Sequence, residues 1–240
     1  MKAAGPGVYS DKNKPLGRWG LAGLENLAEK LVAADFRKVA GGYEVSATRA
    51  FTGKDPALAI TVAEKVVVGA GGVLEASATF DVPEALADLP RLGFRWDVAP
   101  GFETLEWFGL GPRESYVDRK AGSRVGLFAS TVADQFFPYV LPQENGNHEE
   151  TRWFALTDGK GRGLRFESTG KLFGFSAQHV TPEDLTAALH TNEIEPRAET
   201  CVLVDAAQRG VGTASCGPDT LPKYRLRAGK TTLRYRVVPL

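Results

Sequence analysis

The chain has 240 residues and 43% of them are hydrophobic, which is enough to bury the core of one large all-β domain or of two small domains. Its 29 Lys and Arg residues balance 29 Asp and Glu residues, so the sequence offers no basic surface and argues against nucleic-acid binding. The most apolar stretch, residues 65–74, is too short and too rich in glycine to cross a bilayer, and residues 1–7 precede no apolar run typical of a secretory signal. We therefore expect a cytoplasmic protein that contacts neither nucleic acid nor a membrane.

Cysteine and histidine provide no recognisable metal motif. Cys201 and Cys216 are too few for a disulfide framework and form no Cys-x-x-Cys pair. His148, His179 and His190 lie 31 and 11 residues apart, spacings that match no ligand template, although folding could still bring them together. We expect two free thiols, with a disulfide between them as the alternative, and no metal or other cofactor in this chain.

Glycine and proline recur about every eight to twelve residues through most of the chain, a rhythm typical of short strands joined by turns. Regular strand–helix alternation and a Gly-x-Gly-x-x-Gly turn are both absent, which argues against a (β/α)8 barrel and a dinucleotide-binding fold. The sequence thus predicts an all-β fold. The predicted strands are residues 43–51, 58–68, 73–80, 92–98, 103–108, 124–131, 152–156, 163–167, 172–177, 200–204, 223–227 and 232–237.

Two short helices are predicted to interrupt these strands. The first rests on apolar residues at three- and four-residue steps; they are Leu21, Leu24, Leu27, Ala28, Leu31 and Val32. In the second, Thr181 is the predicted N-cap, Pro182 suits the first helical position, and Asp184 follows the cap by three residues. This helix places His190 in its last turn, where protonated His is favoured. Its predicted inward-facing residues are Leu185, Ala188 and Leu189.

Two segments resemble a known family. Residues 92–94 with 105–120 (LEWFGLGPRESYVDRK) closely resemble the Trp-[Phe/Leu/Tyr]-Gly-x-Gly-Pro-x-Glu-[Asn/Ser]-Tyr-x-Asp-Arg segment of the C-terminal domain in bacterial β-galactosidases of glycoside hydrolase family two. Residues 138–147 (PYVLPQENGN) resemble that domain's Pro-Tyr-x-x-Pro-[Gln/Ser]-Glu-Asn-Gly. Further matches follow in the same order, so the resemblance covers roughly residues 15–238; they are residues 151–153, 173–177, 189–190 and 204–212.

This resemblance implies the small-chain domain, a large twisted β-sandwich (supersandwich) of the galactose-mutarotase-like kind. Such a domain is either the last part of a long enzyme or a separate small subunit. We expect residues 15–240 to form it and residues 1–14 to be a leader or loop, because the Pro-[Thr/Leu]-Asp-Asn-Asp segment that usually opens the domain is missing. The implied partner is the catalytic (β/α)8 domain or large subunit, with the β-galactoside substrate bound through a shared site in an oligomeric enzyme. A domain that covers a barrel is also expected to expose an apolar face when isolated.

The resemblance implies that catalysis uses two carboxylates of a barrel that this chain lacks, so we assign no catalytic residue here. Asn192-Glu193 imitates the acid/base pair of such barrels but follows a helix end, and we interpret the match as coincidental. Glu114 and Glu144 are interpreted as structural carboxylates that accept hydrogen bonds from Arg113, Arg119 or loop amides. The four tryptophans are expected in the core; they are Trp19, Trp96, Trp107 and Trp153.

The loop of residues 210–220 is implied by the resemblance to reach the active-site entrance. Some family members place a tryptophan where Cys216 stands, and nothing near Cys216 in the sequence would lower its pKa, so we predict a rim residue and not a nucleophile. The predicted substrate-rim residues are Ser215, Cys216, Gly217 and Asp219.

Two other functions remain open from the sequence. A carbohydrate-binding module is compatible with the neutral charge, although no aromatic cluster supports it. An aldose-epimerase-like enzyme would need a His acid and a carboxylate base beside a sugar. The alternative sugar-contact residues for that activity are Glu144, His179, His190 and Asp205.

Overall fold

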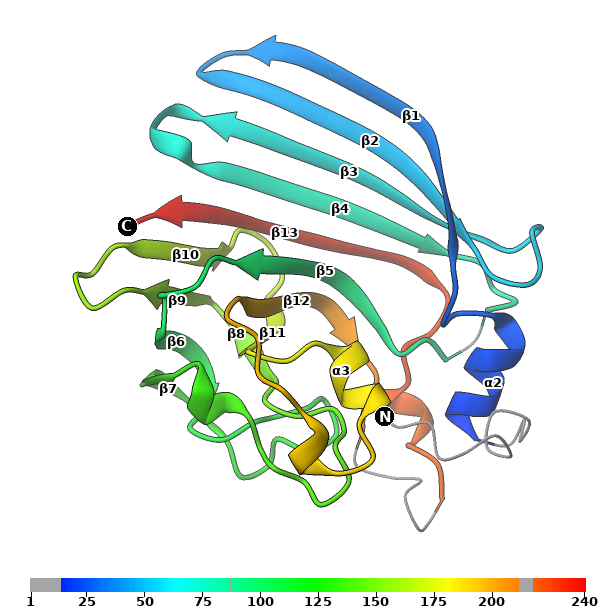
Figure 1. The fold of residues 1–240 in the computed structure, drawn as a ribbon. Helices are drawn as coiled ribbons and strands as arrows, with labels where there is room; N and C mark the ends of the chain where they lie inside the picture. Colours follow the sequence, from blue (N-terminus) through cyan, green and yellow to red (C-terminus); the bar gives the residue numbers. More distant parts are fainter. Residues whose placement is uncertain (1–13, 87, 212–217) are drawn as a thin grey trace.

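The computed structural model describes residues 14–86, 88–211 and 218–240. Within these residues, two antiparallel β-sheets pack face to face (Figure 1). The larger sheet has nine strands in the order β1-β2-β3-β4-β13-β10-β9-β6-β7, and the smaller has four in the order β5-β12-β11-β8. The predicted all-β sandwich with two short helices is therefore confirmed.

The larger sheet comprises β1 (Ala28–Val39), β2 (Gly42–Thr52), β3 (Ala59–Gly69), β4 (Leu74–Val82), β6 (Thr104–Gly111), β7 (Arg124–Thr131), β9 (Trp153–Thr157), β10 (Gly163–Ser168) and β13 (Gly229–Pro239). The smaller comprises β5 (Arg91–Val98), β8 (His148–Thr151), β11 (Phe173–Gln178) and β12 (Thr200–Gln208). The helices are α2 (Pro15–Ala22) and α3 (Pro182–Ala187), with 3₁₀ turns η1 (Ala70–Gly72), η2 (Ala133–Gln135), η3 (Thr191–Glu193) and η4 (Pro222–Tyr224).

The core lies between the two sheets and is rich in stacked aromatic rings. Phe154 of β9 stacks on Phe166 of β10 at a centroid distance of 4.6 Å and on Phe175 of β11 at 4.1 Å. Trp96 of β5 meets Phe166 edge to face at 5.6 Å. These contacts join strands of both sheets, and aromatic pairs of this geometry add to the stabilisation from burial alone. Trp19 and Trp107 are buried and Trp96 and Trp153 are partly buried.

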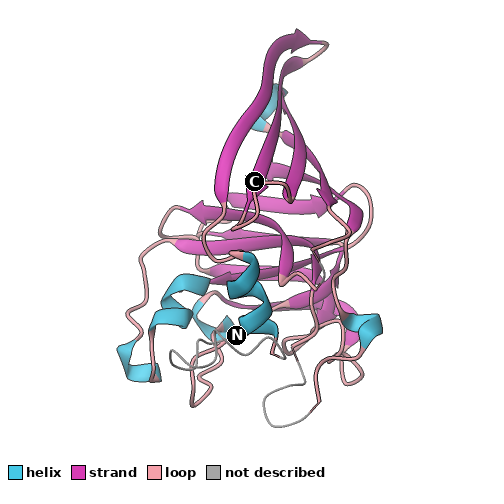
Figure 2. Ribbon diagram, turned by 90° about the vertical axis from the view of Figure 1, so that its right-hand side faces the viewer, coloured by secondary structure: helices cyan, strands magenta, loops and turns pink. Residues whose placement is uncertain are grey.

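Alternation along β5 decides which residues face the core. Leu92 and Val98 are buried, and the partly buried Phe94 and Trp96 pack against the same core. Because successive side chains of a strand point to opposite faces, the intervening residues Arg91, Gly93 and Arg95 lie on the outer face of the small sheet. That outer face is where the helices α2 and α3 lie (Figures 1 and 2).

The first predicted helix is wrong in its position. The helix α2 ends at Ala22, with Gly23 in the left-handed conformation (φ 74°), and Ala28 already begins strand β1. A Cβ at Gly23 would lie 2.7 Å from the backbone nitrogen of Lys54, so this position requires glycine, which terminates the helix. The apolar spacing from Leu24 to Val32 therefore runs through a turn into an edge strand.

The second predicted helix is confirmed at its start and is wrong at its end. Thr181 and Asp184 form a reciprocal capping box, and Leu185 and Ala188 are buried as expected. The helix ends at Ala187, so Leu189 is 57% exposed and His190 lies beyond the last turn. His190 instead precedes η3, and its Nδ1 lies 2.8 Å from Glu193 Oε1.

Eleven of the twelve predicted strands occur, with boundaries that differ by a few residues. Residues 223–227 do not form a strand, because Pro222 begins the 3₁₀ turn η4 there. The strands β1 and β8 were not predicted. The four residues of β8 (HEET) are too polar for a hydrophobic pattern, and β1 was assigned to the first helix.

The larger sheet extends past the smaller one, as Figures 1 and 2 show for the strands β1 to β3. The register places Tyr43 beside Val68, and Val45 beside both Phe36 and Val66, on the face that carries the core residues Ile60 and Val62 further along β3. We call the exposed apolar part of this surface the uncovered inner face. It comprises Leu31, Phe36, Tyr43, Val45 and Val68. Exposed apolar surface of this kind marks contact sites in soluble proteins.

Candidate functional site

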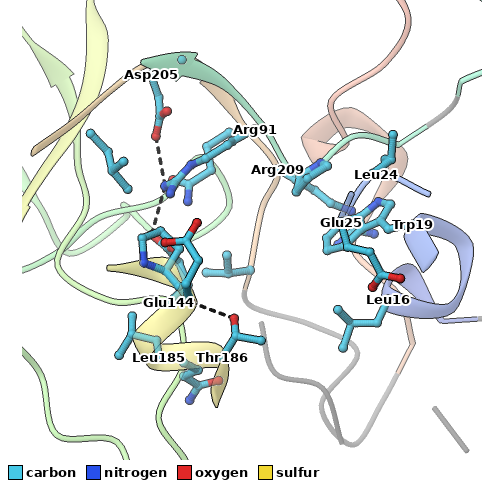
Figure 3. Close-up of a pocket in the computed structure, with 18 of the residues that line it drawn as sticks. Leu16, Trp19, Leu24, Glu25, Arg91, Glu144, Leu185, Thr186, Asp205 and Arg209 are labelled. Atoms are coloured by element: carbon cyan, nitrogen blue, oxygen red, sulfur yellow. Dashed lines mark hydrogen bonds and ion pairs between the residues drawn. The ribbon is translucent and has the colours of Figure 1, made fainter. Parts of the chain in front are cut away.

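A groove of about 530 Å³ opens on the outer face of the small sheet (Figure 3). Strands β5 and β12 form its floor, and α2, α3 and the loop that carries Glu144 form its walls. Leu16 and Leu24 on one side and Leu185 on the other give the walls apolar surface. A concave site with apolar walls and a few converging polar groups is the usual form of a small-molecule site.

Arg91 lies on the floor of the groove between two carboxylates. Its Nη2 atom is 3.2 Å from Glu144 Oε1 and 3.0 Å from Asp205 Oδ2 (Figure 3). Burial by itself would lower the pKa of Arg91, but the charges of Asp205 and Glu144 hold that pKa above its ordinary value. We call these three residues the Arg91 centre. Glu144 and Asp205 are two of the residues predicted for sugar contact, and the structure brings them together through Arg91.

Asp205 is almost completely buried, with 2% of its surface exposed. Burial raises the pKa of its carboxyl to about 7, although Arg91 acts in the opposite direction. The register pairs Asp205 with Gly93, and a Cβ at Gly93 would lie 2.2 Å from Asp205 Oδ1. Glycine is therefore required at position 93 for the carboxylate to lie over β5.

Several polar atoms around the Arg91 centre have no hydrogen-bond partner among the described residues. These buried atoms without a hydrogen-bond partner are both carboxylate oxygens of Asp205, the Nε atom of Arg91 and the phenol oxygen of Tyr116. Oδ2 of Asp205 still forms the ion pair with Arg91. Since nearly all buried polar groups in proteins are hydrogen-bonded, such atoms mark a place where water or a ligand binds.

A second ionic cluster lies beside the groove. Arg209, with 1% of its side chain exposed, donates to Asp88 Oδ1 at 2.6 Å and to Asp219 Oδ1 at 2.6 Å. Burial acts to raise the pKa of Asp219, but the hydrogen bonds from Arg209 and Arg18 bring it below its ordinary value. Asp219, a predicted rim residue, is thus held by ion pairs within the chain. Ser215, Cys216 and Gly217 lie outside the described residues.

The three histidines lie apart from the Arg91 centre. His179 pairs with Glu103 at 2.9 Å and His190 with Glu193, and neither lines the groove. His148 is buried between Trp107 and Phe175, and burial lowers the pKa of its ring to about 4. The structure therefore supplies no histidine acid beside Glu144 and Asp205.

Glu114 has the structural contacts that were predicted for it. It accepts hydrogen bonds from Arg119, from the Tyr139 hydroxyl at 2.5 Å and from the Gly146 amide at 2.6 Å. Gly146 has a positive φ of 76°, a backbone conformation that favours glycine. Glu114 thus connects three segments of chain, whereas Glu144 accepts from Arg91, which was not among its expected partners.

Sequence reasoning missed Arg91, Gly93 and Arg209. Arg91 immediately precedes the predicted strand 92–98, so the hydrophobic pattern did not indicate which face of the sheet its side chain would occupy. The available signal was the pair of non-apolar residues, Arg91 and Gly93, at alternate positions beside an apolar strand face.

Among the described residues, no cluster of three His, Cys, Asp or Glu side chains has the geometry to hold a metal ion. In the same part of the chain, no helix has the length and apolar character needed to span a membrane. Cys201 is buried in β12, and burial raises the pKa of its thiol to about 11.

Comparison with known proteins gives consistent results. A family profile described as "Beta galactosidase small chain" matches residues 10–238. The β-galactosidase of Arthrobacter sp. (strain B7) is 35% identical over 161 residues, which are 65% of this chain and 16% of that enzyme. The β-galactosidase of Streptococcus thermophilus is 36% identical over 149 residues, covering 62% of this chain and 14% of that enzyme. The chain thus spans about one sixth of these relatives.

Among solved structures, a putative aldose 1-epimerase of Escherichia coli K12 has a TM-score of 0.39 and 9% identity, covering 88% of this chain and 69% of that one. This likeness is too low to support an argument. The family profile, in contrast, extends over almost the entire sequence, including residues 105–120 and 138–147. The chain therefore belongs to the β-galactosidase small-chain family.

Proposed function

We propose that this chain is the small-chain part of a β-galactosidase that hydrolyses terminal β-D-galactosides. In this proposal it packs on the catalytic (β/α)8 domain or large subunit and contributes a loop to the rim of the shared active site. We further propose that the enzyme is cytoplasmic and oligomeric. Membership of the family is the observation that carries the proposal.

The uncovered inner face supports the packing part of the proposal. Phe36 is 65% exposed and Leu31 is 57% exposed, and the ring of Phe36 stacks on Tyr43 at 5.5 Å. Complete burial of a fully exposed large apolar side chain contributes about 1.5–3 kcal/mol, and these partly exposed side chains contribute in proportion to their exposed area. An interface that covers this face would therefore gain substantial stability.

The test uses two adjacent alanines of β1 whose side chains lie on opposite faces. Ala34 pairs with Ala47 on the inner face, and Ala33 pairs with Thr48 on the outer face; both are exposed. In the assembled enzyme, Ala34→Lys should weaken the association of the chain with the catalytic part, measured by sedimentation, and Ala33→Lys should not. Equal effects of the two variants would contradict packing through this face.

The chain alone should not cleave nitrophenyl β-galactoside, because a retaining glycosidase needs two suitably placed carboxylates and we assign none here. Activity should appear when the catalytic part is added. Turnover by the repurified chain alone, well above the buffer rate, would overturn this part of the proposal.

The rim contribution is assigned to Ser215, Cys216, Gly217 and Asp219. In the assembled enzyme, Cys216→Trp should change the affinity for the leaving sugar or acceptor more than the hydrolysis of an activated aryl galactoside. The reason is that an indole ring stacks on a sugar bound beyond the cleaved bond, where a thiol cannot. Equal effects on both substrates would contradict the assignment.

A further inference from the structure

We propose that the Arg91 centre is a binding site for a neutral sugar of monosaccharide size, distinct from any hydrolytic function of the enzyme. The site consists of Arg91, Glu144 and Asp205 at the floor of the groove between α2 and α3. This proposal does not rest on the proposed function, because it concerns binding by this chain alone.

Asp205 gives the first support for a ligand. Both of its carboxylate oxygens are buried, and the residue lines the groove. Oδ2 forms the ion pair with Arg91, whereas Oδ1 has neither a hydrogen bond nor an ion pair among the described residues. A buried acceptor without a donor is costly, and a bound hydroxyl group relieves that cost. The unpartnered Nε of Arg91 needs an acceptor in the same place. Adjacent hydroxyl groups of a sugar provide donors and acceptors together.

The Arg91 centre is accessible from the groove. Glu144 and Arg91 have side chains that are 17% and 22% exposed, so both can be reached from the groove, whereas Asp205 lies beneath them. A sugar would therefore contact Glu144 and Arg91 nearer the surface of the groove, and one of its hydroxyl groups would donate to Asp205 Oδ1 below them. The volume of about 530 Å³ lies within the usual range for small-ligand sites, about 300–1,000 Å³.

The charges that line the groove favour a neutral ligand. Its other two guanidinium groups are already matched, since Arg95 pairs with Asp97 and Glu183, and Arg209 pairs with Asp88 and Asp219. An anionic ligand would meet no unmatched arginine, and a cationic ligand at the Arg91 centre would have to compete with Arg91 for Glu144 and Asp205. A hydroxyl-rich neutral molecule has neither disadvantage.

Apolar surface lies beside the polar floor of the groove. Leu16 and Leu24 face the groove from the α2 side, opposite the Arg91 centre, and Leu185 lines it from α3 (Figure 3). A sugar ring presents C–H groups on one face and hydroxyl groups at its edge. This pairing of apolar wall and polar floor fits such a molecule.

The test is a calorimetric titration of the 240-residue chain with D-galactose and with D-glucose. Glu144→Gln removes the accessible carboxylate and should weaken binding about tenfold or more, because hydrogen bonds to charged groups are among the strong ones. Glu183→Gln is the matched control: the same substitution in the same groove, at a side chain that is 73% exposed and paired with Arg95. It should change affinity less than about twofold.

The charged analogues D-glucuronate and D-glucosamine should bind more weakly than the neutral sugars. Absence of saturable binding by both neutral sugars would overturn the proposal, as would equal effects of Glu144→Gln and Glu183→Gln. Tighter binding of D-glucosamine would show an acidic site and overturn the assigned ligand class. None of these results depends on association with a catalytic part, so they are distinguishable from failure of the proposed function.

Discussion

Arg209 is a buried cation that two carboxylates neutralise. Only 1% of its side chain is exposed, and it contacts Asp88 and Asp219 while donating also to the Thr220 hydroxyl at 3.0 Å. Burial by itself would lower its pKa, but Asp88 and Asp219 hold the pKa above the ordinary value. The side chain of Asp88 is only 7% exposed, so water stabilises neither charge well. The Arg209 and Asp88 charges therefore stabilise one another.

Removing Arg209 should therefore destabilise the fold strongly. We expect Arg209→Met to lower the free energy of unfolding by about 3–5 kcal/mol, because it leaves a buried carboxylate with less compensation. Arg162→Met breaks an ion pair with Asp158 in which the arginine is 72% exposed, and it should cost less than about 1 kcal/mol. Urea denaturation of both variants measures the difference, and similar losses would contradict the structural role of Arg209.

His148 predicts a pH dependence of stability. Its pKa is about 4 in the folded chain against an ordinary value of 6.5, so the unfolded chain binds more protons between these pH values. The free energy of unfolding should therefore fall as the pH drops from 6.5 to 4, by about 3 kcal/mol from this residue. Chemical denaturation across this range, compared with His148→Gln, isolates the contribution.

Asp205 acts in the opposite direction, and this must be separated from the effect of His148. Its pKa is about 7 in the folded chain against an ordinary value of 3.8, so the folded chain binds more protons between those pH values. Its contribution to the free energy of unfolding therefore increases as the pH falls from 7 to 4, by about 4 kcal/mol. Adding His148→Gln to an Asp205→Asn variant should therefore change how the free energy of unfolding depends on pH. If the double variant and the Asp205→Asn variant show the same pH dependence, the assignment to His148 is incorrect.

At the scale of elements, the hydroxyl group of Thr181 caps the N-terminus of α3. Thr181 Oγ1 accepts from the Asp184 amide at 3.1 Å, and Asp184 accepts in return from the Thr181 amide at 2.9 Å. Thr181→Val keeps the volume but removes the acceptor, and it should destabilise the chain by about 1–2 kcal/mol. Thr186→Val, within the same helix and exposed, is the control and should cost less. Thermal unfolding that ranks them in reverse would refute this.

The helix α3 was predictable because its signals are local. The cap, the proline and the acidic residue lie within four positions, so residues of the helix itself determine where it begins. The end of α2 was not predictable, because Gly23 terminates it through a close approach to Lys54, a residue from the following hairpin. The edge strand β1 was also hidden, since nearly all of its residues are exposed and no alternation marks it.

The candidate site shows the same division. The epimerase-like alternative drew attention to Glu144 and Asp205, but Arg91 joins them across 53 and 114 positions of sequence, a separation that no local pattern encodes. The folded register alone places Gly93 against Asp205. Sequence reasoning could thus predict the chemical types in the groove but not their assembly.

At the scale of the whole molecule, the two sheets are unequal in width. Nine strands face four, and β5 is an edge strand of the small sheet within the described residues. Beside β5 runs a groove of about 350 Å³ lined by Phe51, Ile60 and Phe94, next to the uncovered inner face. Exposed strand edges and apolar faces are sites where another chain adds or packs. The described part of the sandwich therefore presents a surface suited to a partner.

This asymmetry predicts that the isolated chain self-associates as its concentration rises. Two copies can bury the uncovered inner face against one another when no catalytic part is present, because burial of each large apolar side chain contributes about 1.5–3 kcal/mol. Sedimentation velocity should show oligomers that Ala34→Lys reduces, since a charge on the inner face is costly to bury. Ala33→Lys, on the outer face of the same strand, should leave them unchanged. A chain that stays monomeric at high concentration would show that this face needs no cover, and it would remove the structural support for packing on a catalytic domain.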